Sequence, residues 1–198
     1  MIDVKAAGEY YKTIRKLPEE FQKLPQIEND FKRRLYFVGI LTKYLLLEGI
    51  RPVVVGGHAV EFYTLGAYTT GDLDIVCPEQ EEIEHLLPAW GFQKVGRLWV
   101  NVEYDIELDI VSSSLKEAVS SRISEISVAD LKVFLIGVED LIIDRLNAAV
   151  FWKSEEDARW AEQFWKLHQQ EIDQDYLIER AKEEGVVEIL EKIKNEKI

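Results

Sequence analysis

The chain has 198 residues, of which 47% are hydrophobic, and its formal net charge at pH 7 is −13. This length and apolar content suit one substantial hydrophobic core and exclude an intrinsically disordered chain. The negative charge disfavours a polynucleotide partner, because affinity for nucleic acids comes mainly from neutralising phosphates.

The sequence has a single cysteine and no long apolar segment, and both features narrow the class of protein. Cys77 is the only cysteine, so the chain cannot form an internal disulfide or a thiolate metal cluster. The start lacks an apolar core of signal-peptide length, and no later run approaches the roughly 20 apolar residues that span a bilayer. We therefore expect a cytoplasmic protein that does not enter a membrane.

In chain order, the first predicted element is a helix over residues 29–49. Its apolar residues recur at helical spacing, Asn29 or Asp30 can cap its start, and Gly49 can end it. From Arg51 to about Val111 the period changes to that of strands, in short segments rich in β-branched residues. These segments are VVV, DLDIV, LWVNV and DIELDIV, separated by Gly, Pro or a short helix-like stretch.

The second half of the chain is predicted to be mostly helical. After SRISEISV and LKVFLI, which predict one or two further strands, three helices are expected: VEDLIIDRLNAAVFW, SEEDARWAEQFWKLHQQ and the tail from Asp175. The pattern predicts one α+β domain over residues 1–198, with a helical lead-in (1–50), a sheet core (51–136) and a helical C-terminal part (137–198). A separate helical subdomain stays open.

Gly56 and Gly57 follow the VVV strand and precede the helix-like HAVEFYTL. Most glycine pairs at strand ends are structural, because glycine allows unusual dihedral angles and close packing. Here the position also suits phosphate binding, since backbone N–H groups at a helix start can receive phosphate oxygens. The pair belongs to neither a Walker loop nor a GxGxxG turn.

Asp72 and Asp74 lie two residues apart in GDLDIV and therefore project from one face of a strand. Two carboxylates so close repel, and a divalent cation removes the repulsion. Mg²⁺ suits such hard oxygen ligands and takes its remaining ligands from waters and substrate phosphates. The alternative is an edge strand that carries charge against aggregation.

A third acid is expected from DIELDIV. Its apolar residues alternate with Asp105, Glu107 and Asp109, so one face of the strand should present three carboxylates. If this strand lies beside the Asp72 strand, three acids can hold two metal ions. Glu107 and Asp109 are both candidates, and an ordinary amphipathic strand is the alternative.

These motifs together resemble the nucleotidyltransferase superfamily with a polymerase-β-like fold. Gly56-Gly57 is similar to its hG[GS] motif, Asp72-Leu73-Asp74-Ile75 to its [DE]h[DE]h motif, and Asp109 in LDIV to its third carboxylate. VEDLIIDRLNAAVFWKSEEDARW also resembles a region of bacterial minimal nucleotidyltransferases, toxin-type members included. The resemblance runs from about Phe37 to Trp165.

The resemblance implies a fold, an activity and a set of site residues. The fold is a mixed β-sheet flanked by helices, with an N-terminal helix and a C-terminal helical segment. The activity is transfer of a nucleoside monophosphate from an NTP to an acceptor hydroxyl, with release of pyrophosphate. Asp72, Asp74 and Asp109 would be catalytic and would bind Mg²⁺ or Mn²⁺. The implied nucleotide-binding residues are Gly56, Gly57, Thr70 and Arg145.

Three positions depart from the family pattern. Tyr68 stands where relatives often carry an arginine, Arg145 replaces a lysine, and Ser154 replaces an acid. The first departure leaves open a nucleotide-binding module of the toxin–antitoxin type that has lost turnover. An enzyme similar to antibiotic nucleotidyltransferases is a further alternative. The acceptor (a small molecule, a protein or RNA), the NTP and any partner protein stay undetermined at this stage.

Overall fold

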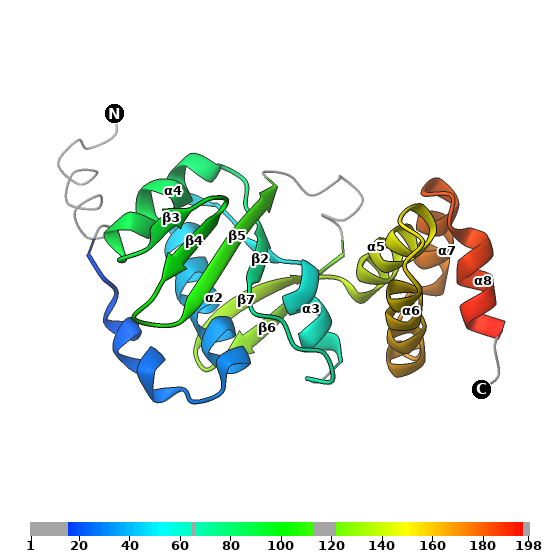
Figure 1. Cartoon of the computed structure of the whole chain (residues 1–198), viewed down its shortest axis with the longest axis horizontal. Coiled ribbons are helices and arrows are strands. Elements are labelled where there is room, and N and C mark those ends of the chain that lie inside the picture. The colour runs from blue at the N-terminus through cyan, green and yellow to red at the C-terminus, as the bar shows by residue number, and fades with distance from the viewer. Residues whose placement is uncertain (1–15, 65, 113–121, 196–198) are drawn as a thin grey trace. The chain divides into compact units, whose positions relative to one another are not determined.

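The computed structural model describes residues 16–64, 66–112 and 122–195, and Figure 1 shows the chain as a cartoon. Residues 1–15 of the predicted helical lead-in lie outside the described residues. The elements in chain order are η1 (Glu19–Gln26), α2 (Asp30–Leu45), η2 (Leu46–Glu48), β1 (Val53–Val54), α3 (Gly56–Tyr63), β2 (Leu73–Val76), α4 (Gln80–Ala89), β3 (Gln93–Val95), β4 (Leu98–Asn101), β5 (Ile106–Ser112), β6 (Ile123–Val128), β7 (Leu131–Ile136), α5 (Val138–Phe151), α6 (Glu155–His168), α7 (Gln174–Glu183) and α8 (Val187–Asn195).

Seven strands form one sheet in the order β3-β4-β5-β2-β1-β7-β6. β2 and β5 are parallel, whereas β1 and β2, β3 and β4, and β4 and β5 pair in antiparallel fashion. The sheet is therefore mixed, and helices precede and follow it along the chain. This confirms the predicted α+β class.

The described residues fall into two compact units. The sheet unit comprises residues 16–54, 70–112 and 125–134, and the helical unit comprises residues 55–64, 66–69, 122–124 and 135–195. The expectation of one domain over residues 1–198 stays a prediction.

In the sheet unit, α2 begins where the sequence predicts but ends at Leu45, and the 3₁₀ helix η2 completes the predicted stretch up to Gly49. The Asn29 side chain accepts a hydrogen bond of 2.9 Å from the Lys32 amide, and Gly49 adopts a left-handed φ of +73° just after η2. At Gly39 a Cβ atom would lie 2.7 Å from the Cβ of Leu131 in β7, so only glycine lets helix and strand approach this closely. The rings of Phe21 and Phe37 are buried in the core and pack edge to face, with 6.1 Å between their centroids.

The structure differs from the sequence prediction in three elements. β3 was not predicted, because Gln93, Lys94 and Val95 are all exposed and give no alternation of apolar and polar residues. The 3₁₀ helix η1 lies in the predicted helical lead-in, but the sequence pattern did not single it out as an element, and it contains Pro25. The tail was predicted as one helix but forms α7 and α8, which Gly185 separates with a φ of +74°.

In the helical unit, α5 packs against α3, α6 and α7, and α8 packs against α6 and α7. The apolar residues of α5, including Leu141, Ile142 and Leu146, are buried, as the helical period predicts. Ser154 caps α6 by accepting a hydrogen bond of 3.2 Å from the Asp157 amide. None of the helices in the described residues has both the length and the hydropathy that a membrane span needs.

Candidate functional site

The parallel pairing of β2 and β5 brings two predicted site residues together. Asp74 pairs with Asp109, Leu73 with Leu108 and Ile75 with Ile110. Paired residues on neighbouring strands project from the same face, and neighbouring strands lie about 4.8 Å apart. The register therefore places Asp109 beside Asp74, and Glu107 lies two residues before Asp109 in β5.

The other face of β2 carries its apolar residues. Leu73 and Ile75 are fully buried, whereas Asp72 and Asp74 are half-buried. The Thr70 hydroxyl donates a hydrogen bond of 2.9 Å to Oδ1 of Asp72. This contact holds the Asp72 carboxylate, and nucleotide binding by Thr70 stays a prediction.

The Asp109 carboxylate is buried and forms an ion pair with an arginine. Nε of Arg97 lies 3.0 Å from Oδ2 of Asp109, whose side chain is 5% exposed, while the Arg97 side chain is 76% exposed. Arg97 follows Gly96 in the turn between β3 and β4, and the next residue, Leu98, pairs with Asp109. Sequence reasoning missed Arg97, because β3 was not predicted and the hairpin was therefore not seen.

The three carboxylates expected on one face of DIELDIV do not lie together. Asp105 precedes β5, has a positive φ of 52° and forms an ion pair of 3.1 Å with Arg33. Glu107 lies in the strand and is exposed, and only Asp109 among the three is buried. The positive φ at Asp105 takes it out of the strand's alternation, which corrects the prediction for this residue.

The fit of a metal ion was tested on this acidic face, which we define as Asp72, Asp74 and Asp109. Within the described residues, no group of three or more His, Cys, Asp or Glu side chains is arranged to hold a metal ion. Two carboxylates in register, Asp74 and Asp109, have donor chemistry that suits Mg²⁺. Asp109 faces Arg97 through Oδ2, and a carboxylate has two oxygens that can accept, so this ion pair is compatible with a metal ligand at Asp109.

Gly56 and Gly57 open α3 in the helical unit instead of forming a turn before it. Gly56 has a φ of +59°, which explains why glycine stands at this position. His58, next to the pair, is fully buried, with Nδ1 3.6 Å from Oε2 of Glu61. His58 therefore belongs to the core, while phosphate binding by the glycines stays a prediction.

Arg145 and Tyr68 both have protein partners within the helical unit. Arg145 pairs with Asp157 at 2.9 Å and with Asp144 at 2.5 Å. Burial lowers the pKa of Arg145, but these two carboxylates outweigh burial and raise it above its usual value. The Tyr68 ring packs edge to face on Trp160 at 5.2 Å between ring centroids. The structure thus gives both residues packing partners, and nucleotide binding by Arg145 stays a prediction.

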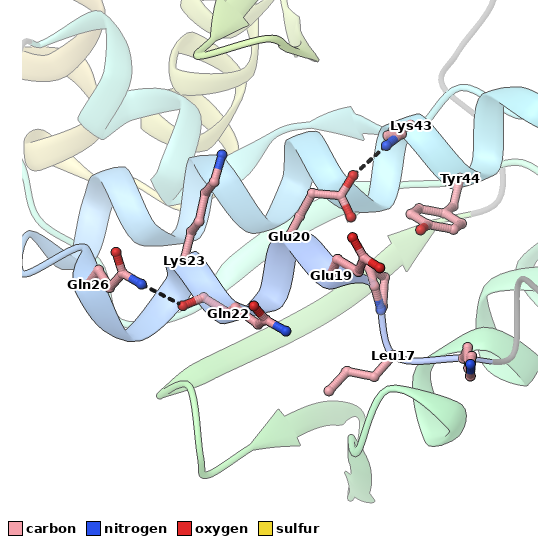
Figure 2. Close-up of a pocket in the computed structure, with 10 residues that line it drawn as sticks. Leu17, Glu19, Glu20, Gln22, Lys23, Gln26, Lys43 and Tyr44 are labelled. Atoms are coloured by element: carbon pink, nitrogen blue, oxygen red, sulfur yellow. Dashed lines mark hydrogen bonds and ion pairs between the residues drawn. The ribbon is translucent and has the colours of Figure 1, made fainter.

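A pocket of about 740 Å³ lies elsewhere in the sheet unit, between η1 and the C-terminal end of α2. Figure 2 shows that its wall is polar, with an ion pair between Lys43 and Glu20 and a hydrogen bond between Gln26 and Gln22. No residue of the acidic face lines it. The predicted site residues and this pocket are therefore separate features.

The chain was compared with known proteins. No family model matches it, and no curated protein matches its sequence significantly. The crystal structure of an antigenic nucleotidyltransferase-like protein from Paracoccidioides brasiliensis is similar, with a TM-score of 0.55 and 13% identity over 84% of this chain and 93% of that chain. The solution structure of the antibiotic-resistance factor ANT(2'')-Ia matches with a TM-score of 0.49 and 14% identity over 80% and 94% of the two chains. The first likeness shows a nucleotidyltransferase-like fold, as the sequence resemblance predicted.

Proposed function

We propose that the protein transfers a nucleoside monophosphate from an NTP to an acceptor hydroxyl and releases pyrophosphate. The main support is the register between β2 and β5, which sets Asp74 beside Asp109 on one face of the sheet. This pair lies in a fold that resembles a nucleotidyltransferase-like protein. Two neighbouring carboxylates favour a cation between them, and Mg²⁺ or Mn²⁺ is suited to such ligands.

In this proposal each residue of the acidic face has a role. Asp72 and Asp74 bind the metal, with Thr70 orienting the Asp72 carboxylate through its hydrogen bond. Asp109 lies nearest the acceptor hydroxyl, as a further ligand or as the base that takes its proton. When bound, Mg²⁺ supplies charge neutralisation for the phosphates and lowers the pKa of the attacking hydroxyl. The acceptor oxygen bonds to the α-phosphorus as the bond to the bridging oxygen of the β-phosphate breaks.

The acceptor and further nucleotide contacts rest on the sequence resemblance. Gly56, Gly57 and Arg145 belong to the helical unit and are proposed as nucleotide-binding residues on that ground. The acceptor is a small molecule, a protein or RNA, and the net charge of −13 disfavours RNA. A partner protein and a cytoplasmic location are likewise part of the proposal.

A second function is a nucleotide-binding module of the toxin–antitoxin type without turnover. The observation that favours it is Tyr68, which takes the place of a phosphate-binding arginine and packs on Trp160. Loss of a charge-assisted contact to a phosphate weakens substrate binding and catalysis together. The two functions differ in one measurable property: a transferase moves the nucleoside monophosphate from the NTP to an acceptor, whereas a binding module leaves the NTP intact.

The test is incubation of the protein with each NTP labelled at the α-phosphate, Mg²⁺ and a cell extract. Transfer of label to an acceptor, lost in Asp72→Asn/Asp74→Asn and kept in the strand control Glu107→Gln, supports the transferase. NTP binding without transfer supports the module. Absence of both binding and transfer overturns both functions.

A further inference from the structure

The acidic face poses an electrostatic problem for the proposed substrate. Asp72, Asp74 and Asp109 gather three acidic side chains, and a triphosphate brings several negative charges of its own. A metal ion offsets part of this repulsion, and enzymes that transfer phosphoryl groups also place arginine or lysine side chains on the phosphates. The family pattern would provide an arginine at position 68, where this chain has a tyrosine.

Arg97 is a cation at this face that the sequence motifs do not include. Its Nε lies 3.0 Å from Oδ2 of Asp109, and its side chain is 76% exposed. The ion pair with Asp109 has its closest approach at Nε. A guanidinium has five N–H donors and one carboxylate pairs with at most two of them, so this exposed side chain keeps donors for another acceptor.

The backbone around Arg97 keeps this cation close to the acids. Arg97 follows Gly96 (φ +63°) in the tight turn of the β3–β4 hairpin. The residue after it, Leu98, is the cross-strand partner of Asp109, which is itself the partner of Asp74. The hairpin thus places the exposed guanidinium of Arg97 one residue before the position that pairs with Asp109.

We propose that Arg97 binds the phosphate chain of the nucleotide at the acidic face. In the absence of nucleotide the Asp109 carboxylate holds the guanidinium at this position. A planar fork of N–H donors matches phosphate oxygens better than a lysine ammonium does. The inference rests on the proposed function.

Lys94 on the same hairpin is the matched control. It lies in β3, carries the same charge and forms an ion pair of 2.6 Å with Glu84, away from the acidic face. Its ammonium also lies 5.2 Å from the centre of the Trp99 ring. Lys94→Gln therefore removes one positive charge from the hairpin without removing a partner of Asp109.

The experiment measures binding of inorganic tripolyphosphate with Mg²⁺ by calorimetry, because this probe has a phosphate chain but no base. Binding of an α,β-methylene analogue of each NTP is measured alongside. We expect Arg97→Gln to weaken binding of both probes about tenfold or more, the size of one charge-assisted hydrogen bond. Arg97→Lys should recover part of the loss, and Lys94→Gln should bind within about twofold of wild type. Melting curves check that each variant folds.

Each outcome decides the assignment. Equal binding by wild type and Arg97→Gln overturns the role of Arg97 and leaves the proposed function standing. Equal losses in Arg97→Gln and Lys94→Gln also overturn it, because they indicate a general charge effect. If wild type binds neither tripolyphosphate nor any NTP analogue, the proposed function fails together with this inference.

Discussion

Asp109 differs from the neighbouring acids of its strand in burial and in pairing. Its side chain is 5% exposed and pairs with Arg97, whereas Glu107 is exposed. A buried carboxylate with a fixed partner is held in one orientation, which a catalytic ligand or base requires. The two residues therefore allow a direct comparison on one strand.

We predict that Asp109→Asn lowers single-turnover transfer about 100-fold or more, because it removes the proposed ligand or base while keeping the size of the side chain. Glu107→Gln should change the rate by no more than about twofold. The rates are measured under conditions in which enzyme exceeds NTP, with a melting curve for each variant. An inactive Glu107→Gln and an active Asp109→Asn would show that the third acid has been assigned wrongly.

At the scale of elements, the junction between α5 and α7 buries a carboxylate. Asp140 is 3% exposed, and the Tyr176 hydroxyl lies 3.0 Å from both of its oxygens. The Arg122 guanidinium lies 4.5 Å from the centre of the Tyr176 ring. Burial raises the pKa of Asp140 to about 6, although the hydrogen bond from Tyr176 and the charge of Arg180 oppose the rise.

This raised pKa predicts a pH dependence of stability. Between the ordinary value of 3.8 and about 6 the folded state binds more protons at Asp140 than the unfolded state does. The contribution of Asp140 to the free energy of unfolding therefore falls as pH rises through this window, by roughly 2–3 kcal/mol. Asp140→Asn does not titrate, so its stability relative to wild type should rise from pH 4 to pH 7. Urea unfolding at several pH values measures this, and a constant difference would contradict it.

The contact between α2 and β7 depends on a glycine. Gly39→Ala gains about 1 kcal/mol of helix propensity but forces a Cβ to within 2.7 Å of the Leu131 Cβ. Because overpacking costs roughly 1–3 kcal/mol, we expect a lower free energy of unfolding. Gly71→Ala is the control, since a Cβ there meets nothing within 4 Å, and its effect should stay below about 1 kcal/mol. Thermal unfolding of both variants tests the pair, and a stabilised Gly39→Ala would mean that Leu131 moves aside at little cost.

For the molecule as a whole, the net charge of −13 causes self-repulsion that destabilises the folded state. Added cations screen this repulsion, so Mg²⁺ raises stability in part without binding to a specific site. Specific binding must therefore be separated from screening. The acidic face provides the comparison, because Asp72 and Asp74 can be neutralised while most of the other acids remain.

We predict that Mg²⁺ at ten times its dissociation constant raises the melting temperature by about 3–6 °C through linkage. Asp72→Asn/Asp74→Asn should lose most of this rise. NaCl at matched ionic strength measures the part that is due to screening. An equal rise in wild type and in the double variant would place the binding of Mg²⁺ elsewhere.

Spacing and residue type along the chain are enough to predict the local pattern of the strands and to mark candidate acids. Alternation in DLDIV separates Asp72 and Asp74 from buried Leu73 and Ile75, and a helical period marks α2, α5 and α6. Caps such as Asn29 are equally local, since side chain and amide lie three residues apart. These features depend on neighbours in the chain, so spacing and residue type were enough to predict them.

Contacts between residues from distant segments follow from the folded sheet and could not be read from local spacing. The register of β2 on β5 puts Asp109 beside Asp74, and the β3–β4 hairpin brings Arg97 to Asp109. An exposed strand such as β3 has no alternation of apolar and polar residues by which to recognise it. An ion pair between two segments, such as that of Arg97 and Asp109, has no characteristic spacing along the chain. The backbone angle of Asp105 likewise removes it from a face to which alternation alone assigns it. Pairing across strands is set by the packing of the whole sheet, which the spacing within one segment does not encode.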